Sequence, residues 1–252
     1  MINEKIKNKD RREKMNAFIE NSMRIEISDN PDSVLWMAVN CREKEAVLAA
    51  LENGGNPLAV MPSNSNTALI NSVYRDDAEI FKILLPLSDP NTQNNEGETA
   101  LIKAGSSFKK EIISILLGDA RVDADLKDKY GGTALKYALN EPFPDATIRG
   151  LALASSQETR EAAFKAKLGS LQKFAAGSLT PPAITAPRWK TLDALSEWMP
   201  EGLMKDALET LGEWAAIRTP RLTARWEAMA LEKEMALGDK GNQGAKNLSR
   251  RM

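Results

Sequence analysis

The chain has 252 residues, 42% of them hydrophobic and 27% charged, and its 34 basic and 35 acidic residues leave a net charge of −1. This composition is typical of a folded protein, and the balanced charge excludes broad electrostatic capture of nucleic acid. The absence of histidine and the single cysteine, Cys41, exclude histidine-based catalysis, histidine metal sites and an internal disulfide.

The N-terminal segment, residues 1–32, is predicted to be a charged stretch that ends in a short cap. Residues 1–14 are highly charged, and the cap would be formed by apolar side chains at Phe18, Ile19, Met23, Ile25 and Ile27. The basic residues are not followed by the apolar core of a signal peptide, and no stretch approaches the ~20 apolar residues of a membrane span. We therefore expect a cytoplasmic protein without a membrane span.

Residues 33–155 contain a repeated motif. Thr-Ala-Leu begins at Thr67, Thr99 and Thr133, and a degenerate copy, Ser-Val-Leu, begins at Ser33, so the motif recurs after 34, 32 and 34 residues. A constant period in the range of about 20–50 residues is the signature of a repeat architecture. The predicted units are 33–66, 67–98, 99–132 and 133–155.

Each unit is predicted to form two short helices and a turn. The second residue after the first motif position is always leucine, and the fifth is always small. Small residues let neighbouring helices approach, and leucines fill the space between them. The first three units carry a second apolar stripe at helical spacing: Val47, Leu48 and Leu51; Ile80, Ile83, Leu84 and Leu85; Ile112, Ile113, Leu116 and Leu117. Polar, turn-rich segments separate the units and place each threonine where it can cap the next helix.

The C-terminal part of the chain is divided by prolines. The fourth unit ends in a helix near Asp145 to Ala154, and the helix from Gln157 to Ala176 is predicted to cap the array. The remaining segments are a capping region at 156–179, a proline-rich linker at 180–188, a tryptophan-rich helical module at 189–237 and a disordered basic tail at 238–252. The helices of the module are expected at about 190–199, 201–217 and 220–237. The tryptophans of the module either form the core of a small bundle or serve a second binding site.

The repeated units resemble ankyrin repeats. The family pattern D-x-x-G-x-T-P-L-H-x-A is matched best from Asn94 to Ala104 and next best from Asp128 to Ala138, and Asp89-Pro90-Asn91 resembles the family's A-D-x-N turn. The proline after the threonine is replaced by alanine or valine. The family's histidine, which helps to hydrogen-bond adjacent loops, is replaced by Trp36, Ile70, Ile102 or Lys136. The resemblance implies an all-α solenoid of helix pairs with short hairpin-like turns, here followed by a small helical C-terminal module, and degenerate terminal units that act as caps.

The resemblance also implies that another protein binds on the concave face, at the hairpin tips and the first helix of each unit. The family's contact positions correspond here to Ser63, Asn64, Asn66, Tyr74, Arg75, Asn95, Glu96, Glu98, Ser106, Ser107, Lys129, Tyr130, Asn140 and Glu141. Tyr74, Arg75 and Tyr130 are expected to contribute most, because tyrosine and arginine are enriched among interface hot spots.

Three functions remain open. The first is a non-enzymatic interaction protein: an adaptor, an inhibitor or an immunity-type neutraliser. The second is a secreted bacterial effector whose repeats target a host protein, which would place it in a host cell. The third, an enzyme with a catalytic C-terminal domain, is the weakest, because the carboxylates there are expected on outward helix faces: Asp193, Glu197, Glu201, Asp206, Glu209 and Glu213. No catalytic residue, cofactor site or metal site is predicted.

Overall fold

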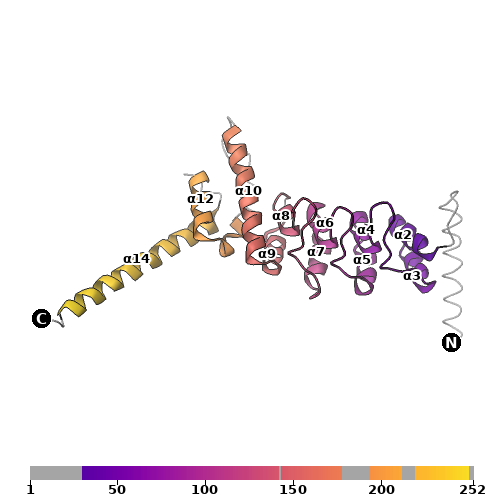
Figure 1. Cartoon of the computed structure of the whole chain (residues 1–252), viewed down its shortest axis with the longest axis horizontal. Helices are drawn as coiled ribbons and strands as arrows, with labels where there is room; N and C mark the ends of the chain where they lie inside the picture. Colours follow the sequence, from indigo (N-terminus) through magenta and orange to yellow (C-terminus); the bar gives the residue numbers. More distant parts are fainter. Residues whose placement is uncertain (1–29, 142, 178–192, 212–218, 250–252) are drawn as a thin grey trace.

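The structure is a computed structural model that describes residues 30–141, 143–177, 193–211 and 219–249 (Figure 1). Over these residues the fold is built from helices, and its β-structure consists of an isolated bridge between Val60 and Thr67. The prediction of an all-α protein is confirmed. The predicted N-terminal cap and proline-rich linker lie outside the described residues.

The repeats stack into two rows of helices (Figure 1). The first-helix row holds α2 (Pro31–Cys41), α4 (Ala68–Arg75), α6 (Ala100–Ser106) and α8 (Ala134–Ala138). The second-helix row holds α3 (Lys44–Glu52), α5 (Ala78–Leu84), which continues into the 3-10 turn η1 (Leu85–Leu87), α7 (Lys110–Leu117) and α9 (Asp145–Ala154). Each helix packs against the next one in its own row, so the main contacts of each unit are with its neighbours.

The repeated threonines begin the first helices of units two to four. The hydroxyls of Thr67, Thr99 and Thr133 each accept a hydrogen bond, 3.2 Å long, from the backbone N–H three residues later. Unit one differs from the other units, because α2 begins at Pro31, and Ser33, the counterpart of the threonines, lies inside the helix. Asn30 caps it by accepting from the N–H of Asp32 at 2.9 Å, and the following proline suits the first helical position.

The predicted leucines and small residues form the core between the units. All are at most 1% exposed: Leu35, Leu69, Leu101, Leu135, Ala38, Ser72, Ala104 and Ala138. Gly105 allows an especially close approach of α6 and α8, since a Cβ on this residue would lie 2.7 Å from the carbonyl oxygen of Ala134. The predicted inner packing of the repeats is therefore confirmed.

The hairpins before α6 and α8 are each closed by their first polar side chain. Asn94 Oδ1 accepts from the N–H groups two and four residues later at 2.9 Å, and Asp128 Oδ1 does the same at 2.9 and 2.7 Å. Gly97 and Gly131 supply the positive φ angles of these turns, +74° and +68°. In each hairpin, the first residue of the D-x-x-G pattern thus supplies the side-chain hydrogen bonds, and the glycine supplies the backbone conformation of the turn.

Neighbouring hairpins are joined through their backbones. The N–H of Asn95 donates to the carbonyl of Asn64 at 3.1 Å, and the N–H of Lys129 donates to the carbonyl of Glu96 at 3.0 Å. The hairpin tips of units two to four therefore form a continuous edge beside the first-helix row.

Helix α10 (Gln157–Gly177) ends the repeat array. It packs beside α8 and so continues the first-helix row, with Phe164, Leu168 and Leu171 buried. The carboxylate of Asp125 accepts from the N–H of Ser156, directly before the helix, at 2.9 Å. The structure thus contains the predicted helix and packs it on the last unit.

The C-terminal elements contact this end of the array. They are η3 (Ser196–Trp198), α12 (Glu201–Leu211) and α14 (Pro220–Ser249). The guanidinium groups of Arg149 and Arg160 lie 5.4 and 6.0 Å from the ring of Trp198, and Arg149 pairs with Glu197 at 2.6 Å. Trp198 and Trp226 pack against the hydrophobic cluster that the segment shares with the repeats, which favours a packing role for these tryptophans. Trp189 and Trp214 lie outside the described residues.

Two expectations for this segment are corrected. The predicted disordered tail is helical up to Ser249, because it extends an existing helix, where elongation is far cheaper than nucleation, and it contains no proline. Asp193, expected on an outward helix face, is 8% exposed and accepts from the N–H of Leu222 at 3.0 Å at the start of α14. Burial raises its pKa above the ordinary aspartate value. Within the described ranges, no helix has both the length and the apolar character needed to cross a bilayer.

Candidate binding surface on the first-helix row

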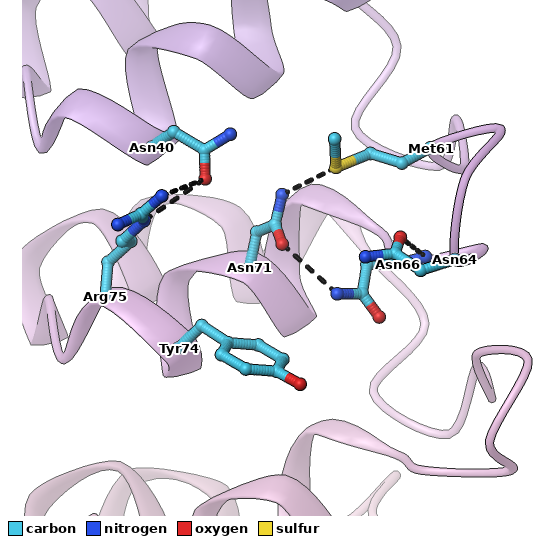
Figure 2. A pocket seen from close by; sticks show the side chains of 7 residues that line it. All are labelled: Asn40, Met61, Asn64, Asn66, Asn71, Tyr74 and Arg75. Carbon is cyan, nitrogen blue, oxygen red and sulfur yellow. Dashed lines mark hydrogen bonds between the residues drawn. The ribbon is translucent and has the colours of Figure 1, made fainter.

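An open hollow lies between α2, α4 and the turn that precedes α4 (Figure 2). Its volume is about 420 Å³, and its lining residues are Asn40, Met61, Asn64, Asn66, Asn71, Tyr74 and Arg75. Four of the five contact positions predicted in unit two, Asn64, Asn66, Tyr74 and Arg75, are among them. The structure therefore brings these positions together in one concave place.

Arg75 joins the first two units across this hollow. It is the last residue of α4, and its Nε and Nη2 atoms both donate to Asn40 Oδ1 at 3.2 Å (Figure 2). Among the described residues, no carboxylate forms an ion pair with Arg75. The guanidinium charge is therefore held by a neutral amide.

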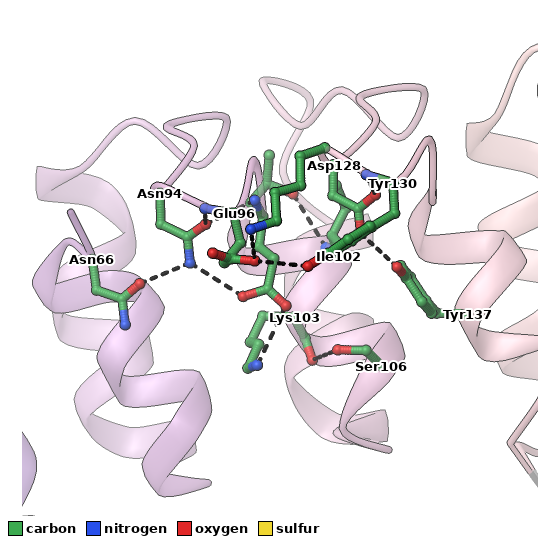
Figure 3. A network of polar contacts seen from close by, with 12 residues as sticks. Asn66, Asn94, Glu96, Ile102, Lys103, Ser106, Asp128, Tyr130 and Tyr137 are labelled. Atoms are coloured by element: carbon green, nitrogen blue, oxygen red, sulfur yellow. Dashed lines mark hydrogen bonds and ion pairs between the residues drawn. The ribbon is translucent and has the colours of Figure 1, made fainter. Parts of the chain in front are cut away.

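Asparagine side chains form a directed chain of hydrogen bonds along the hollow. Asn94 Nδ2 donates to Asn66 Oδ1 at 2.8 Å, and Asn66 Nδ2 donates to Asn71 Oδ1 at 3.3 Å (Figures 2 and 3). Asn71 Nδ2 then donates to the thioether of Met61 at 3.0 Å. Asn66 and Asn71 are only 2% and 6% exposed, and this pair of buried amides ends on the thioether of the partly buried Met61, which is a weak acceptor.

Tyr74 forms an exposed wall of the hollow and is held from unit three. The Lys103 ammonium lies 3.9 Å from the centre of its ring, and the same ammonium pairs with Glu98 at 3.3 Å. Glu98 in turn accepts from Asn94 Nδ2 at 3.1 Å. The tyrosine is 52% exposed, so it is positioned by these contacts while much of its surface stays open.

A second polar cluster lies at the hairpin tips of units three and four. Tyr130 donates its hydroxyl to Glu96 at 3.3 Å (Figure 3). The Lys129 ammonium pairs with Glu96 and lies 5.1 Å from the centre of the Tyr130 ring. The hydrogen bond from Lys129 lowers the pKa of Glu96 and raises that of Lys129. Tyr130 is 68% exposed, so this predicted contact residue projects from the edge of the array.

Tyr137 ties α8 to its hairpin. Its hydroxyl donates to Asp128 Oδ2 at 2.5 Å, and this hydrogen bond, together with burial, raises the pKa of Tyr137 to about 12 (Figure 3). The resemblance assigns such a loop-holding bond to a histidine at the position of Lys136. In this chain the bond is made one residue later.

The other predicted contact positions are spread along the same side of units two to four. Ser63, Asn95 and Asn140 are exposed, whereas Glu98, Ser106, Ser107 and Glu141 are half-buried. Ser106 donates its hydroxyl to the carbonyl of Lys103 at 3.1 Å. These residues remain predicted contacts, and the hollow does not include them.

Sequence reasoning missed three of the residues that line the hollow: Asn40, Met61 and Asn71. Asn71 lies four residues before Arg75 on the same helix, so helical spacing could have placed it on the same face. Asn40 is seven residues after Ser33, as Tyr74 is seven after Thr67, and the repeat register could have identified it. For Met61 the sequence offers no comparable signal.

The first helices of units two to four differ in charge from α2, which contains Asp32 and no basic residue, and from the second-helix row. Helices α4, α6 and α8 contain no aspartate or glutamate and one basic residue each, Arg75, Lys103 and Lys136. Every helix of the second-helix row contains at least one acidic residue. No cluster of three potential metal ligands is found in the parts of the chain that the structure describes.

The family model described as ankyrin repeats (3 copies) matches residues 69–148, in agreement with the repeat geometry. A solved structure, the ankyrin repeat domain of Bcl-3, a member of the IkappaB protein family, is 26% identical over 47% of this chain, with a TM-score of 0.43. The match spans half of that chain's length.

Proposed function

We propose that this chain, which carries ankyrin repeats over residues 69–148, is a non-enzymatic protein that holds a protein partner on its first-helix row and hairpin tips. Ankyrin repeats are a general scaffold for protein–protein interaction. The observation that carries the proposal is the hollow, because four contact positions expected from the resemblance alone line it.

The exposure of two aromatic side chains supports the same surface. Tyr74 and Tyr130 are 52% and 68% exposed, yet each is held by a neighbouring lysine and so loses little conformational freedom on binding. Rigid tyrosines and arginines are the side chains from which interface hot spots are most often built.

A cytoplasmic adaptor, inhibitor or immunity-type neutraliser fits this proposal, and a secreted effector would use the same surface on a host protein. The identity of the partner separates these roles. An affinity pull-down with the full chain from the source cell supplies the partner: a toxin supports neutralisation, and a host protein supports an effector.

The binding test replaces Tyr74, Arg75 and Tyr130 together by alanine. We expect the affinity for the captured partner to fall by several kcal/mol, since hot-spot truncations cost ~2 kcal/mol or more each, while the melting temperature barely changes. Isothermal calorimetry measures the first quantity and a thermal melt the second.

The matched control replaces Lys110, Ser114 and Leu153, which are exposed on the second-helix row, by alanine. This variant should bind the partner as the wild type does. Unchanged affinity in the Tyr74, Arg75 and Tyr130 variant would show that the partner binds elsewhere.

A further inference from the structure

We infer that the hollow between the first two units takes an acidic side chain from an extended segment of the partner protein. The inference rests on the proposed function and specifies its chemistry. Arg75 and Asn71 would bind the carboxylate, and Tyr74 would pack against the neighbouring residues of the segment.

The first support is the state of Arg75. Its guanidinium is held in place by Asn40, which is uncharged, and the described residues provide no carboxylate partner. The Nη1 group makes no hydrogen bond within the described chain, so it is available to an incoming carboxylate. Such charge-assisted hydrogen bonds are stronger than those between neutral groups.

The second support is the directed chain of amides. Each asparagine in the series Asn94, Asn66 and Asn71 donates to the next group, and the last N–H points to the thioether of Met61. Hydrogen bonds in such a series polarise one another, and a carboxylate oxygen is a far better acceptor than a thioether. Methionine is flexible, so Met61 can yield this position to a ligand.

The third support is the geometry of these two donors. Asn71 and Arg75 are four residues apart on α4 and therefore lie on the same face of the helix, where both side chains line the hollow (Figure 2). Two donors on one face can bind the two oxygens of a single carboxylate. None of the seven lining residues is acidic, so nothing in the lining repels such a group.

The fourth support is the sign of the charge along the rest of the row. Arg75, Lys103 and Lys136 follow one another on α4, α6 and α8, which contain no acidic residue. Lys103 is neutralised by Glu98, whereas no ion pair is found for Lys136 within the described residues. A partner segment that runs along α4, α6 and α8 therefore meets positive charge at both ends, at Arg75 and at Lys136, which favours an acidic segment.

The size of the hollow agrees with a peptide side chain and its flanking backbone. A volume of about 420 Å³ lies within the range of ~300–1,000 Å³ that is usual for ligand sites. The asparagines of the lining offer both donors and acceptors, as a peptide backbone requires.

The experiment selects binders to the full chain from a random-peptide display library and measures their affinities by fluorescence anisotropy. We expect the selected peptides to share an aspartate or glutamate at one fixed position. Changing that residue to its amide should weaken binding on the order of tenfold, as should Arg75→Gln in the protein. The two changes combined should cost no more than either alone, because they remove the same interaction.

The control variant is Lys110→Gln, which removes an exposed positive charge from the second-helix row and should leave the affinity unchanged. Thermal melts check that Arg75→Gln is folded. Either of two results would overturn the acidic-segment inference. One is an affinity that Arg75→Gln does not change, and the other is a combined change whose loss of affinity equals the sum of the two single losses.

The same peptides separate this inference from the proposed function. Peptides that lack a shared acid but fail to bind the Tyr74, Arg75 and Tyr130 alanine variant would contradict the inference and leave the binding face in place. Peptides that bind this variant as well as the wild type would contradict both. If the selection yields no binding peptide, the inference is contradicted. The proposed function is then tested with the partner protein captured in the pull-down.

Discussion

Single hydrogen-bonded side chains hold the hairpins to the helices in this array. The hydroxyl of Tyr137 is the shortest such link, at 2.5 Å from a carboxylate oxygen of Asp128, which is only 8% exposed. The same carboxylate closes its own hairpin through two backbone N–H groups. The interaction therefore connects α8, the hairpin and the edge that presents Tyr130.

Tyr137→Phe tests this link. Losing a hydrogen bond to a charged group should lower the free energy of unfolding by about 1.5–3 kcal/mol. Folding raises the Tyr137 pKa from 10.0 to about 12, so the protonated tyrosine stabilises the fold fully below pH 10 and this contribution disappears as the pH rises through 12. The difference between wild type and variant, measured by urea unfolding, should shrink over that window.

Tyr130→Phe is the matched control, because Tyr130 is mostly exposed and its loss should change the stability by less than about 0.5 kcal/mol. A Tyr137→Phe protein as stable as the wild type at neutral pH would show that the Asp128 contact contributes nothing to folding.

Each hairpin must also fit closely against the next hairpin of the array. Gly97 and Gly131 have similar positive φ angles, but their surroundings differ. A Cβ at Gly97 would lie 2.8 Å from the backbone nitrogen of Lys129, whereas a Cβ at Gly131 would meet no atom within 4 Å. Gly97 is therefore required both by its own turn and by the contact with the following hairpin, whereas Gly131 is required by its own turn.

Gly97→Ala and Gly131→Ala separate these two requirements. Gly131→Ala should cost about 1 kcal/mol, the usual penalty for a left-handed backbone with a Cβ. Gly97→Ala should cost a further ~1–3 kcal/mol, because the backbone of the next hairpin must shift. Chemical denaturation of both variants gives the comparison, and equal losses would mean that the hairpins adjust to each other freely.

The array and the C-terminal segment share a boundary at α10. The array needs only neighbouring contacts, and α10 already covers its last first-row helix. The C-terminal elements add the Trp198 contact with Arg149 and Arg160, an ion pair between Arg221 and Asp145 at 3.0 Å, and buried side chains that extend the hydrophobic cluster. These contacts lie at one end of the stack.

A fragment of residues 1–179 tests whether this end is needed. We expect it to stay folded and helical, because units one to three keep all their contacts and α10 still covers unit four. Circular dichroism and a thermal melt provide the measurement. A molten or aggregated fragment would show that the repeats and the C-terminal helices fold as one core and that the domain boundary predicted near residue 180 is misplaced.

Some features of this protein follow from its sequence alone because they depend on residues close together in the chain. The three threonine caps join residues three apart, and the buried leucines and small residues keep a fixed register within each unit. At the degenerate motif, Ser33 lies inside α2, and the helix start is marked by Asn30, which caps it, and by the following Pro31.

The site depends on contacts between units, and these only the tertiary structure decided. Residue types and register identified Tyr74 and Arg75, but the bond from Arg75 to Asn40 spans 35 residues and the bond from Asn94 to Asn66 spans 28. The length of each turn and the packing of each helix pair set which side chains meet across such distances. The sequence therefore determined the repeat and the side of it that carries polar residues, whereas the stacking of the units determined that asparagines, a tyrosine and an arginine enclose a hollow.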